Sequence, residues 1–197
     1  RDVLTKRGGS SRIEPLEPKP AEAMDVKFVA PFEPRVTSVA ESILVEAIEY
    51  CAQKTGASER STVVGLLGRQ DRAVSEYCLY SVAKQVAASL GEMDENVKTV
   101  YILDYDATPE DRCFAETFSA RLIHLLVWTC RKTAAFDSLV QALDCALVQA
   151  WSDTFGVRGP ASLLDVQVVD DVDVEQRHGY GTFRTWTHQQ PIQIWER

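Results

Sequence analysis

The sequence contains no long hydrophobic run and none of the short motifs that mark several common enzyme classes. No apolar stretch reaches the roughly 18 residues that a membrane-spanning helix requires, so we expect no membrane association. The phosphate-binding patterns GxxxxGK and GxGxxG, the nucleophile elbow GxSxG and the zinc motif HExxH are all missing. These absences disfavour a nucleotide-binding loop, a hydrolase of the GxSxG type and a zinc protease.

The cysteines form no pattern typical of a metal site or a disulfide framework. Their number, five, is odd, and no two of them stand in a CxxC pair. Each lies among apolar neighbours, where cysteine behaves as a small buried hydrophobic residue. We therefore expect reduced, mostly buried thiols and a cytoplasmic location. The residues concerned are Cys51, Cys78, Cys113, Cys130 and Cys145.

Basic residues are outnumbered by acidic ones, 21 against 29, which gives a net charge of −8. An excess of negative charge keeps a protein soluble and opposes binding to phosphate backbones and anionic lipid. Two consecutive long helices raise helix-turn-helix DNA binding as an alternative, but no clustered basic face accompanies them. We expect a soluble protein without a nucleic-acid partner.

The first part of the chain differs in composition from the rest. Residues 1–35 are rich in proline and contain a glycine–serine run at residues 8–11. Proline removes backbone donors and keeps a chain extended, so we expect an extended N-terminal arm here and one domain over residues 36–197. Val26 and Phe28 are the expected anchors of the arm on the domain or on a neighbouring subunit.

The spacing of the apolar residues predicts five helices. In the first of them, Ile43, Ala47 and Cys51 recur at the interval of one helix face. Gly91 is expected to end the third helix, because glycine favours the backbone conformation that closes helices. The predicted helices cover residues 38–54, 59–68, 71–90, 108–132 and 134–155.

Strands are predicted where β-branched and aromatic residues concentrate or apolar residues alternate with polar ones. They cover residues 97–104, 164–168, 171–175, 182–188 and 192–195. The sequence therefore predicts an α+β fold, with about five helices on one face of a four- to five-stranded antiparallel or mixed sheet. A three-layer α/β fold is the alternative, but it requires a regular alternation of strands and helices.

The most specific local pattern is an apolar run that leads into Asp-x-Asp-x-Thr at Asp104, Asp106 and Thr108. It resembles the first motif of the haloacid-dehalogenase-like phosphatases. The resemblance implies that Asp104 attacks phosphorus, that Asp106 is the general acid and base, and that Mg²⁺ lies between them. That family also needs a serine or threonine after a second strand, a lysine and a later acidic pair.

The interpretation that we favour for this pattern is structural. The two aspartates end a strand, and Thr108 caps the helix that follows. Because residues 109–155 are predicted to be helical throughout, the strand that would carry the second motif is missing.

An acidic run near the end of the chain is the second candidate site. On a strand, Asp171, Asp173 and Glu175 would share one face, about 6–7 Å apart per step. The pair Asp170 and Asp171 would complete a Mg²⁺ site with the aspartates of the Asp-x-Asp-x-Thr pattern. The favoured interpretation is a solvated strand face with valines behind it. Asp170 breaks the alternation, so we expect a turn or a buried partner there.

The leading functional hypothesis is a non-enzymatic, self-associating protein-interaction domain that uses no cofactor. It rests on the missing motifs and on an aromatic C-terminal end, since aromatic residues are enriched at interfaces. We expect Trp195 to be tucked against the protein or a partner. The expected partner is a second copy, as a homodimer, or another protein. The alternative is a Mg²⁺-dependent phosphohydrolase built on the Asp-x-Asp-x-Thr strand end.

Overall fold

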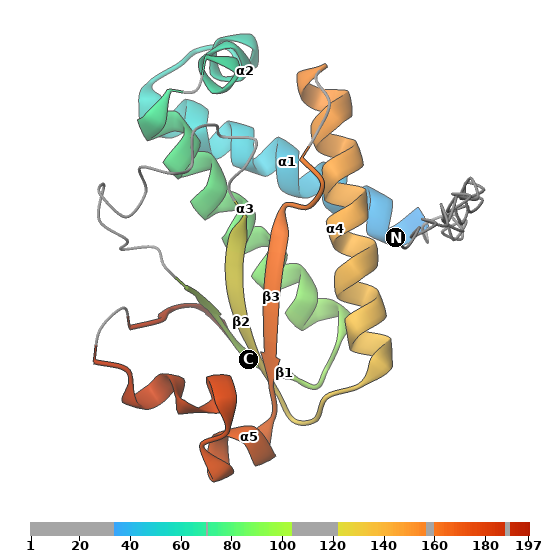
Figure 1. Cartoon of the computed structure of the whole chain (residues 1–197). Helices are drawn as coiled ribbons and strands as arrows, with labels where there is room; N and C mark the ends of the chain where they lie inside the picture. Colours follow the sequence, from blue (N-terminus) through green and yellow to red (C-terminus); the bar gives the residue numbers. More distant parts are fainter. Residues whose placement is uncertain (1–33, 70, 104–121, 157–159, 188–189) are drawn as a thin grey trace, which may run out of the picture. The chain divides into compact units, whose positions relative to one another are not determined.

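Five α-helices, one 3₁₀-helix and four strands make up the described part of the chain (Figure 1). The computed structural model describes residues 34–69, 71–103, 122–156, 160–187 and 190–197. The helices are α1 (Pro34–Thr55), α2 (Arg60–Gly68), α3 (Arg72–Met93), α4 (Ala134–Phe155), α5 (Asp171–Gln176) and the 3₁₀-helix η2 (Gly179–Thr185). The strands are β1 (Val97–Ile102), β2 (Ile123–Thr129), β3 (Leu164–Val169) and β4 (Ile192–Glu196).

The four strands form one mixed sheet in the order β3-β2-β1-β4. β1 pairs antiparallel with both β2 and β4, whereas β2 and β3 are parallel. A parallel pair needs a crossover connection, and α4 provides it between β2 and β3. The predicted α+β fold with a mixed sheet is confirmed, and β3 and β4 are its two edges.

Four of the five predicted helices occur where the apolar periodicity places them, as α1, α2, α3 and α4. Their ends follow from local side chains. Asp71 caps α3 by accepting a hydrogen bond from the N–H of Val74, and Thr133 caps α4 in the same way. Gly156 ends α4 in the left-handed conformation, at φ +64°, which glycine adopts without strain.

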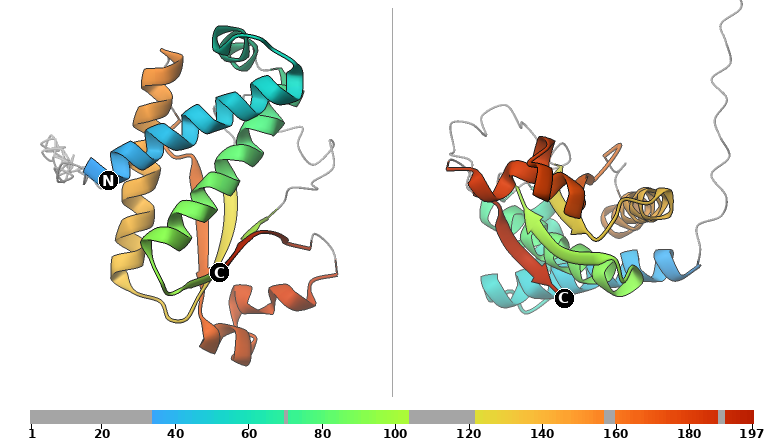
Figure 2. Two further views of the ribbon diagram at one scale, coloured as in Figure 1. Left: turned by 180° about the vertical axis from the view of Figure 1, so that it is seen from behind. Right: turned by 90° about the horizontal axis from the view of Figure 1, so that it is seen from below.

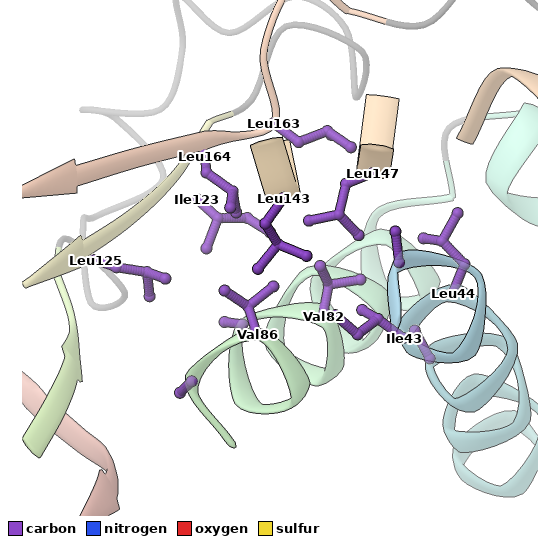
Figure 3. Close-up of a cluster of buried hydrophobic side chains, with 14 of the residues drawn as sticks. Ile43, Leu44, Val82, Val86, Ile123, Leu125, Leu143, Leu147, Leu163 and Leu164 are labelled. Carbon is purple, nitrogen blue, oxygen red and sulfur yellow. The ribbon is translucent and has the colours of Figure 1, made fainter. Parts of the chain in front are cut away.

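The largest hydrophobic core lies between α1, α3 and α4 and one face of the sheet (Figures 1 and 2). Figure 3 shows how side chains from these helices meet those of β2 and β3. Leu125, Leu143 and Leu147 have 0% of their surface exposed. Truncation of such a leucine to alanine costs about 2–5 kcal/mol of stability, because it leaves a cavity.

The helix predicted over residues 108–132 is wrong in its second half, where the structure has the strand β2. β2 lies in the middle of the sheet, and both of its faces are covered. Leu125 and Val127 point into the main core, and Leu126 packs on the other face against Phe183. A strand buried on both faces has no alternation, so its leucines resemble a helical stripe in the sequence.

The strand predicted at residues 171–175 is also wrong, because these residues form α5. Asp170 is the N-cap of this helix: its side chain accepts from the N–H of Asp173, whose side chain accepts in return from the N–H of Asp170. This reciprocal capping box satisfies two of the backbone donors at a helix start. Asp170 thus begins a helix, whereas a turn or a buried partner within a strand was expected from the sequence.

The strand predicted at residues 182–188 is replaced by η2. α5 and η2 pack on the sheet face opposite the long helices (Figure 2). Phe183 is buried there, with its ring centroid 5.0 Å from that of Tyr101 and 6.2 Å from that of Trp128. Phe183 therefore packs on the domain itself, and this contact fixes the segment without a strand.

Gly91 does not end α3, which continues to Met93. The glycine is needed for a close approach, since a Cβ atom at this position would lie 2.1 Å from the indole ring of Trp195. The expectation that Trp195 is tucked against the protein is confirmed by its packing on the core.

The first described helix and the lengths of the helices bear on two further predictions. α1 begins at Pro34, just before the predicted boundary at residue 36. The predicted arm anchors Val26 and Phe28 lie outside the described residues. None of the described helices is long and apolar enough to cross a membrane.

Candidate functional site

Only part of the acidic set singled out in the sequence lies among the described residues. Asp104, Asp106 and Thr108 lie outside the described ranges, so their predicted roles stay predictions. Leu103, the residue before them, donates its N–H to the carbonyl of His124 at 2.9 Å. It therefore lies at the end of the sheet where β2 begins.

Asp170 and Asp171 lie at the other end of β1. Asp171 contacts Lys98, and the five-residue step from Lys98 to Leu103 along an extended strand measures about 16 Å. Thr129, the threonine that ends the second strand, lies at this same end of β1, because β2 runs antiparallel to β1 and pairs Thr129 with Val97. Among the described residues, no group of three or more His, Cys, Asp or Glu side chains could hold a metal ion.

Asp171 instead joins α5 to the sheet. Its two carboxylate oxygens accept hydrogen bonds from Nζ of Lys98 at 2.6 and 2.7 Å, and Oδ1 also accepts from Nε1 of Trp128 at 3.0 Å. The hydrogen bond from Lys98 lowers the pKa of Asp171, and the same bond raises the pKa of Lys98. The guanidinium of Arg184 lies 4.5 Å from the ring centroid of Trp128 and covers it.

A second ion pair supports the same segment. Nζ of Lys132 lies 2.6 Å from Oδ2 of Asp173, and this contact lowers the pKa of the Asp173 carboxyl. Asp171 thus fixes α5 to the sheet, Asp173 fixes it to the segment after β2, and Asp170 is used as a helix cap. The acidic run serves the fold in this structure.

A histidine and an aspartate pair on the same sheet face, on β2 and β3. Nδ1 of His124 lies 2.9 Å from Oδ2 of Asp165, and Nε2 of Gln167 donates to Oδ1 of Asp165 at 3.0 Å. An aspartate of this kind can fix the tautomer of a catalytic histidine. Within the described ranges, however, no serine or cysteine is hydrogen-bonded to His124, so the pair has no nucleophile there.

In the part of the chain that the structure describes, the edge strand β3 pairs with one neighbour, β2. The N–H of Ile123 donates to the carbonyl of Leu163 at 2.8 Å, and a parallel ladder uses every second residue of each strand. Val166 and Val168 therefore direct their backbone N–H and C=O groups away from β2. No described residue forms a hydrogen bond with these four groups.

A groove of about 270 Å³ lies beside this edge, between β3 and α4. The two elements run alongside each other in opposite directions (Figure 1). The apolar part of the groove consists of valine and leucine side chains, and the charged residues that line it, among those that the structure describes, are acidic. The lining residues are Asp137, Val140, Gln141, Asp144, Leu164, Val166 and Val168.

Asp144 fixes the end of this groove where β3 begins. Its Oδ1 accepts from the N–H groups of Leu163 and Leu164 at 2.8 and 2.9 Å, and its Oδ2 accepts from the hydroxyl of Ser162 at 2.7 Å. These bonds connect α4 to the first residues of β3. They also occupy the outward N–H of Leu164, so the open part of the edge is limited to Val166 and Val168.

The sequence predicted β3 but gave no indication that it is an edge. In β3, apolar residues alternate with polar ones, at Leu164, Val166 and Val168. This alternation indicates which face of the strand is buried. An edge strand and an inner strand of a half-buried sheet show the same alternation. Edge position depends on the neighbours of β3, and its neighbour β2 was predicted as a helix.

Comparison with known proteins adds no family to this geometry. No protein-family model matches the chain, and neither a curated protein nor a solved structure is detectably similar to it. The class of protein is therefore defined by the fold alone: an α+β domain with a four-stranded mixed sheet and one open, groove-lined edge.

Proposed function

We propose that this chain is a non-enzymatic protein-interaction domain that adds an extended segment of a partner to its sheet at β3. The observation that carries the proposal is the pair Val166 and Val168, whose backbone groups point outward beside a groove lined by apolar and acidic side chains. In strand addition, main-chain hydrogen bonds supply affinity, and pockets for alternate side chains supply specificity. The β3 edge offers both.

Self-association is one form of this function. Two β3 strands can pair antiparallel about a two-fold axis at Gln167, with Val166 of each copy opposite Val168 of the other. This register uses all four outward backbone groups of each copy. A homodimer and a complex with another protein are thus both compatible with the same edge.

The edge is tested with a matched pair of substitutions at Val166. Val166→Pro removes the outward N–H but no bond of the β2–β3 ladder, since proline is tolerated on the free side of an edge strand. Val166→Thr keeps the N–H and the β-branched shape. We expect wild type and Val166→Thr to bind extended partners and Val166→Pro to lose binding.

Two measurements detect the partner. Light scattering behind size-exclusion chromatography over a wide protein concentration range reports self-association. An array of short peptides that alternate apolar and polar residues reports binding of other chains. A monomer at all concentrations that binds no peptide contradicts the proposal, and so does binding that Val166→Pro leaves unchanged.

We also propose a reducing compartment, the cytoplasm, as the place of action. The four described cysteines are free thiols, and Cys51 and Cys78 are buried side chains of α1 and α3. Buried, unpaired thiols are typical of proteins that are kept reduced. Accumulation of the tagged protein in an oxidising compartment would contradict this location.

A further inference from the structure

We infer that β3 receives a basic extended segment of another protein rather than β3 of a second copy. The segment carries two apolar residues that are separated by one residue. A lysine or arginine stands two positions before the first of them. This inference rests on the proposed function and specifies the chemistry of its partner. It follows from the backbone register, the groove and the charges that line it.

The backbone of β3 fixes which partner residues enter the groove. In an antiparallel pair, a residue that directs its N–H and C=O toward the neighbour exchanges both bonds with one partner residue. Val168 and Val166 would each take one such residue, and these two partner residues are separated by one more. Their side chains lie on the same sheet face as those of Val166 and Val168, which is the groove face.

The groove selects apolar side chains at these two positions. Val140 of α4 and the side chains of Val166 and Val168 line it, and all three are only partly covered by the described chain. β-branched residues opposite the two valines would cover this surface, since cross-strand pairs of that kind are favourable.

The charge of the groove selects the residues that flank the apolar pair. Asp137 and Asp144 are its charged lining residues, and within the described ranges no lysine or arginine lines it. Because α4 runs opposite to β3 and Asp144 is bonded to Leu164, Asp137 lies two helical turns away, toward Val168. By the rises of a helix and a strand, Asp137 lies level with about Gln167. A lysine two positions before the partner residue opposite Val168 would therefore extend its long side chain back along the groove to meet the opposite charge of Asp137.

A second copy offers the wrong charge at the same place. A two-fold axis at Gln167 would bring the acidic grooves of the two copies together. Asp137 of one copy would then lie near the Asp144 end of the groove in the other copy. Each copy also has a net charge of −8. Like charges across an interface suppress association, whereas opposite charges steer it.

The test uses a labelled peptide in fluorescence anisotropy. In the probe, every second residue is threonine, and the residues between the threonines are, in order, lysine, valine, valine and lysine. Both ends of the peptide are blocked. One control peptide has glutamate in place of both lysines. A second control has N-methyl groups on the two valines, which removes the backbone donors that would pair with β3.

We expect the lysine peptide to bind at least 10-fold more tightly than either control, at low ionic strength. Asp137→Asn should weaken the lysine peptide about 2- to 5-fold, which is the range of an exposed ion pair, and should narrow its advantage over the glutamate peptide. Asp153→Asn is the matched control, because Asp153 is an acid of α4 outside the groove. It should leave binding unchanged.

Each failure has its own meaning. Equal binding of the lysine and glutamate peptides overturns the charge selection and keeps strand addition at β3. A dimer that Val166→Pro abolishes, together with no peptide binding, shows that the occupant is a second copy; the inference is then wrong and the proposed function stands. A monomer that binds none of the peptides overturns both.

Discussion

The indole ring of Trp195 occupies the space that a side chain on Gly91 would need. A Cβ atom on Gly91 would lie 2.1 Å from Cζ2 of Trp195, far inside van der Waals contact. The same glycine carbonyl accepts a hydrogen bond from the guanidinium of Arg197, which also donates to the carbonyl of Val97. The end of α3 is thus joined to β4 and to the residues beside it.

Gly91→Ala should destabilise the protein by about 1–3 kcal/mol, because the added methyl group overpacks a filled site. Urea unfolding followed by tryptophan fluorescence measures the change. Gly65→Ala is the control, since Gly65 lies inside α2 with no atom within 4 Å of the added Cβ. There the better helix propensity of alanine should add about 0.5–1 kcal/mol. Equal effects at the two positions would refute the packing role of Gly91.

Asp144→Ala should cost about 2–4 kcal/mol. It leaves the N–H groups of Leu163 and Leu164 without their acceptor, and an unsatisfied buried donor costs about 1–3 kcal/mol. Asp144→Asn keeps one acceptor oxygen for both N–H groups and should lose less than half as much. Equal losses in urea unfolding would show that these bonds do not hold the start of β3.

Asp171→Asn should lower the urea midpoint at pH 7 more than at pH 2.5. Lys98 lowers the pKa of Asp171 below the ordinary value of 3.8. A carboxyl whose pKa is lower in the folded state stabilises the fold above its unfolded pKa, and this contribution is lost as the pH falls through the folded pKa. The difference between variant and wild type should therefore shrink on acidification.

The control for this pH dependence is Asp153→Asn, because Asp153 is an exposed acid at the end of α4 that accepts a hydrogen bond from the neutral side-chain amide of Gln149. Asp153→Asn removes an equal charge and leaves the bond between Lys98 and Asp171 in place. A difference between Asp171→Asn and wild type that is the same at both pH values would rule out the Lys98 contact as its cause.

The cysteines should differ in their reaction with a thiol reagent. Cys130 is exposed, whereas Cys51 and Cys78 are buried. Hydrogen bonding between the last two raises the pKa of Cys78, which further lowers its thiolate fraction. Iodoacetamide followed by peptide mass spectrometry should modify Cys130 in the native protein and the other two only in denaturant. Rapid native labelling of Cys78 would contradict its burial.

The helical half of the fold was predictable because its signals are local. Apolar residues recur on one face of each long helix, and Asp71 and Thr133 cap two of them. These features depend on neighbours a few residues away, so the sequence alone contains them. The strands β1, β3 and β4 were also predicted, since each shows β-branched or alternating residues.

The errors arose where long-range contacts decide the structure. β2 is covered on one face by the long helices and on the other by Phe183, and a strand buried on both faces has no period to detect. α5 did carry a local signal, the Asp170 and Asp173 capping box, but the alternation of valines with acids outweighed it. The candidate site on β3 depends on which strand is its neighbour, and that information is not local.

The sheet order has a consequence for synthesis on the ribosome. β1 lies between β2 and β4, and Thr99 pairs with Glu196, so one side of β1 has no neighbour until β4 has emerged. At roughly 5–20 residues per second, this interval lasts several seconds or longer. During that time one side of β1 is an unpaired strand edge, a template for aggregation that the finished sheet covers.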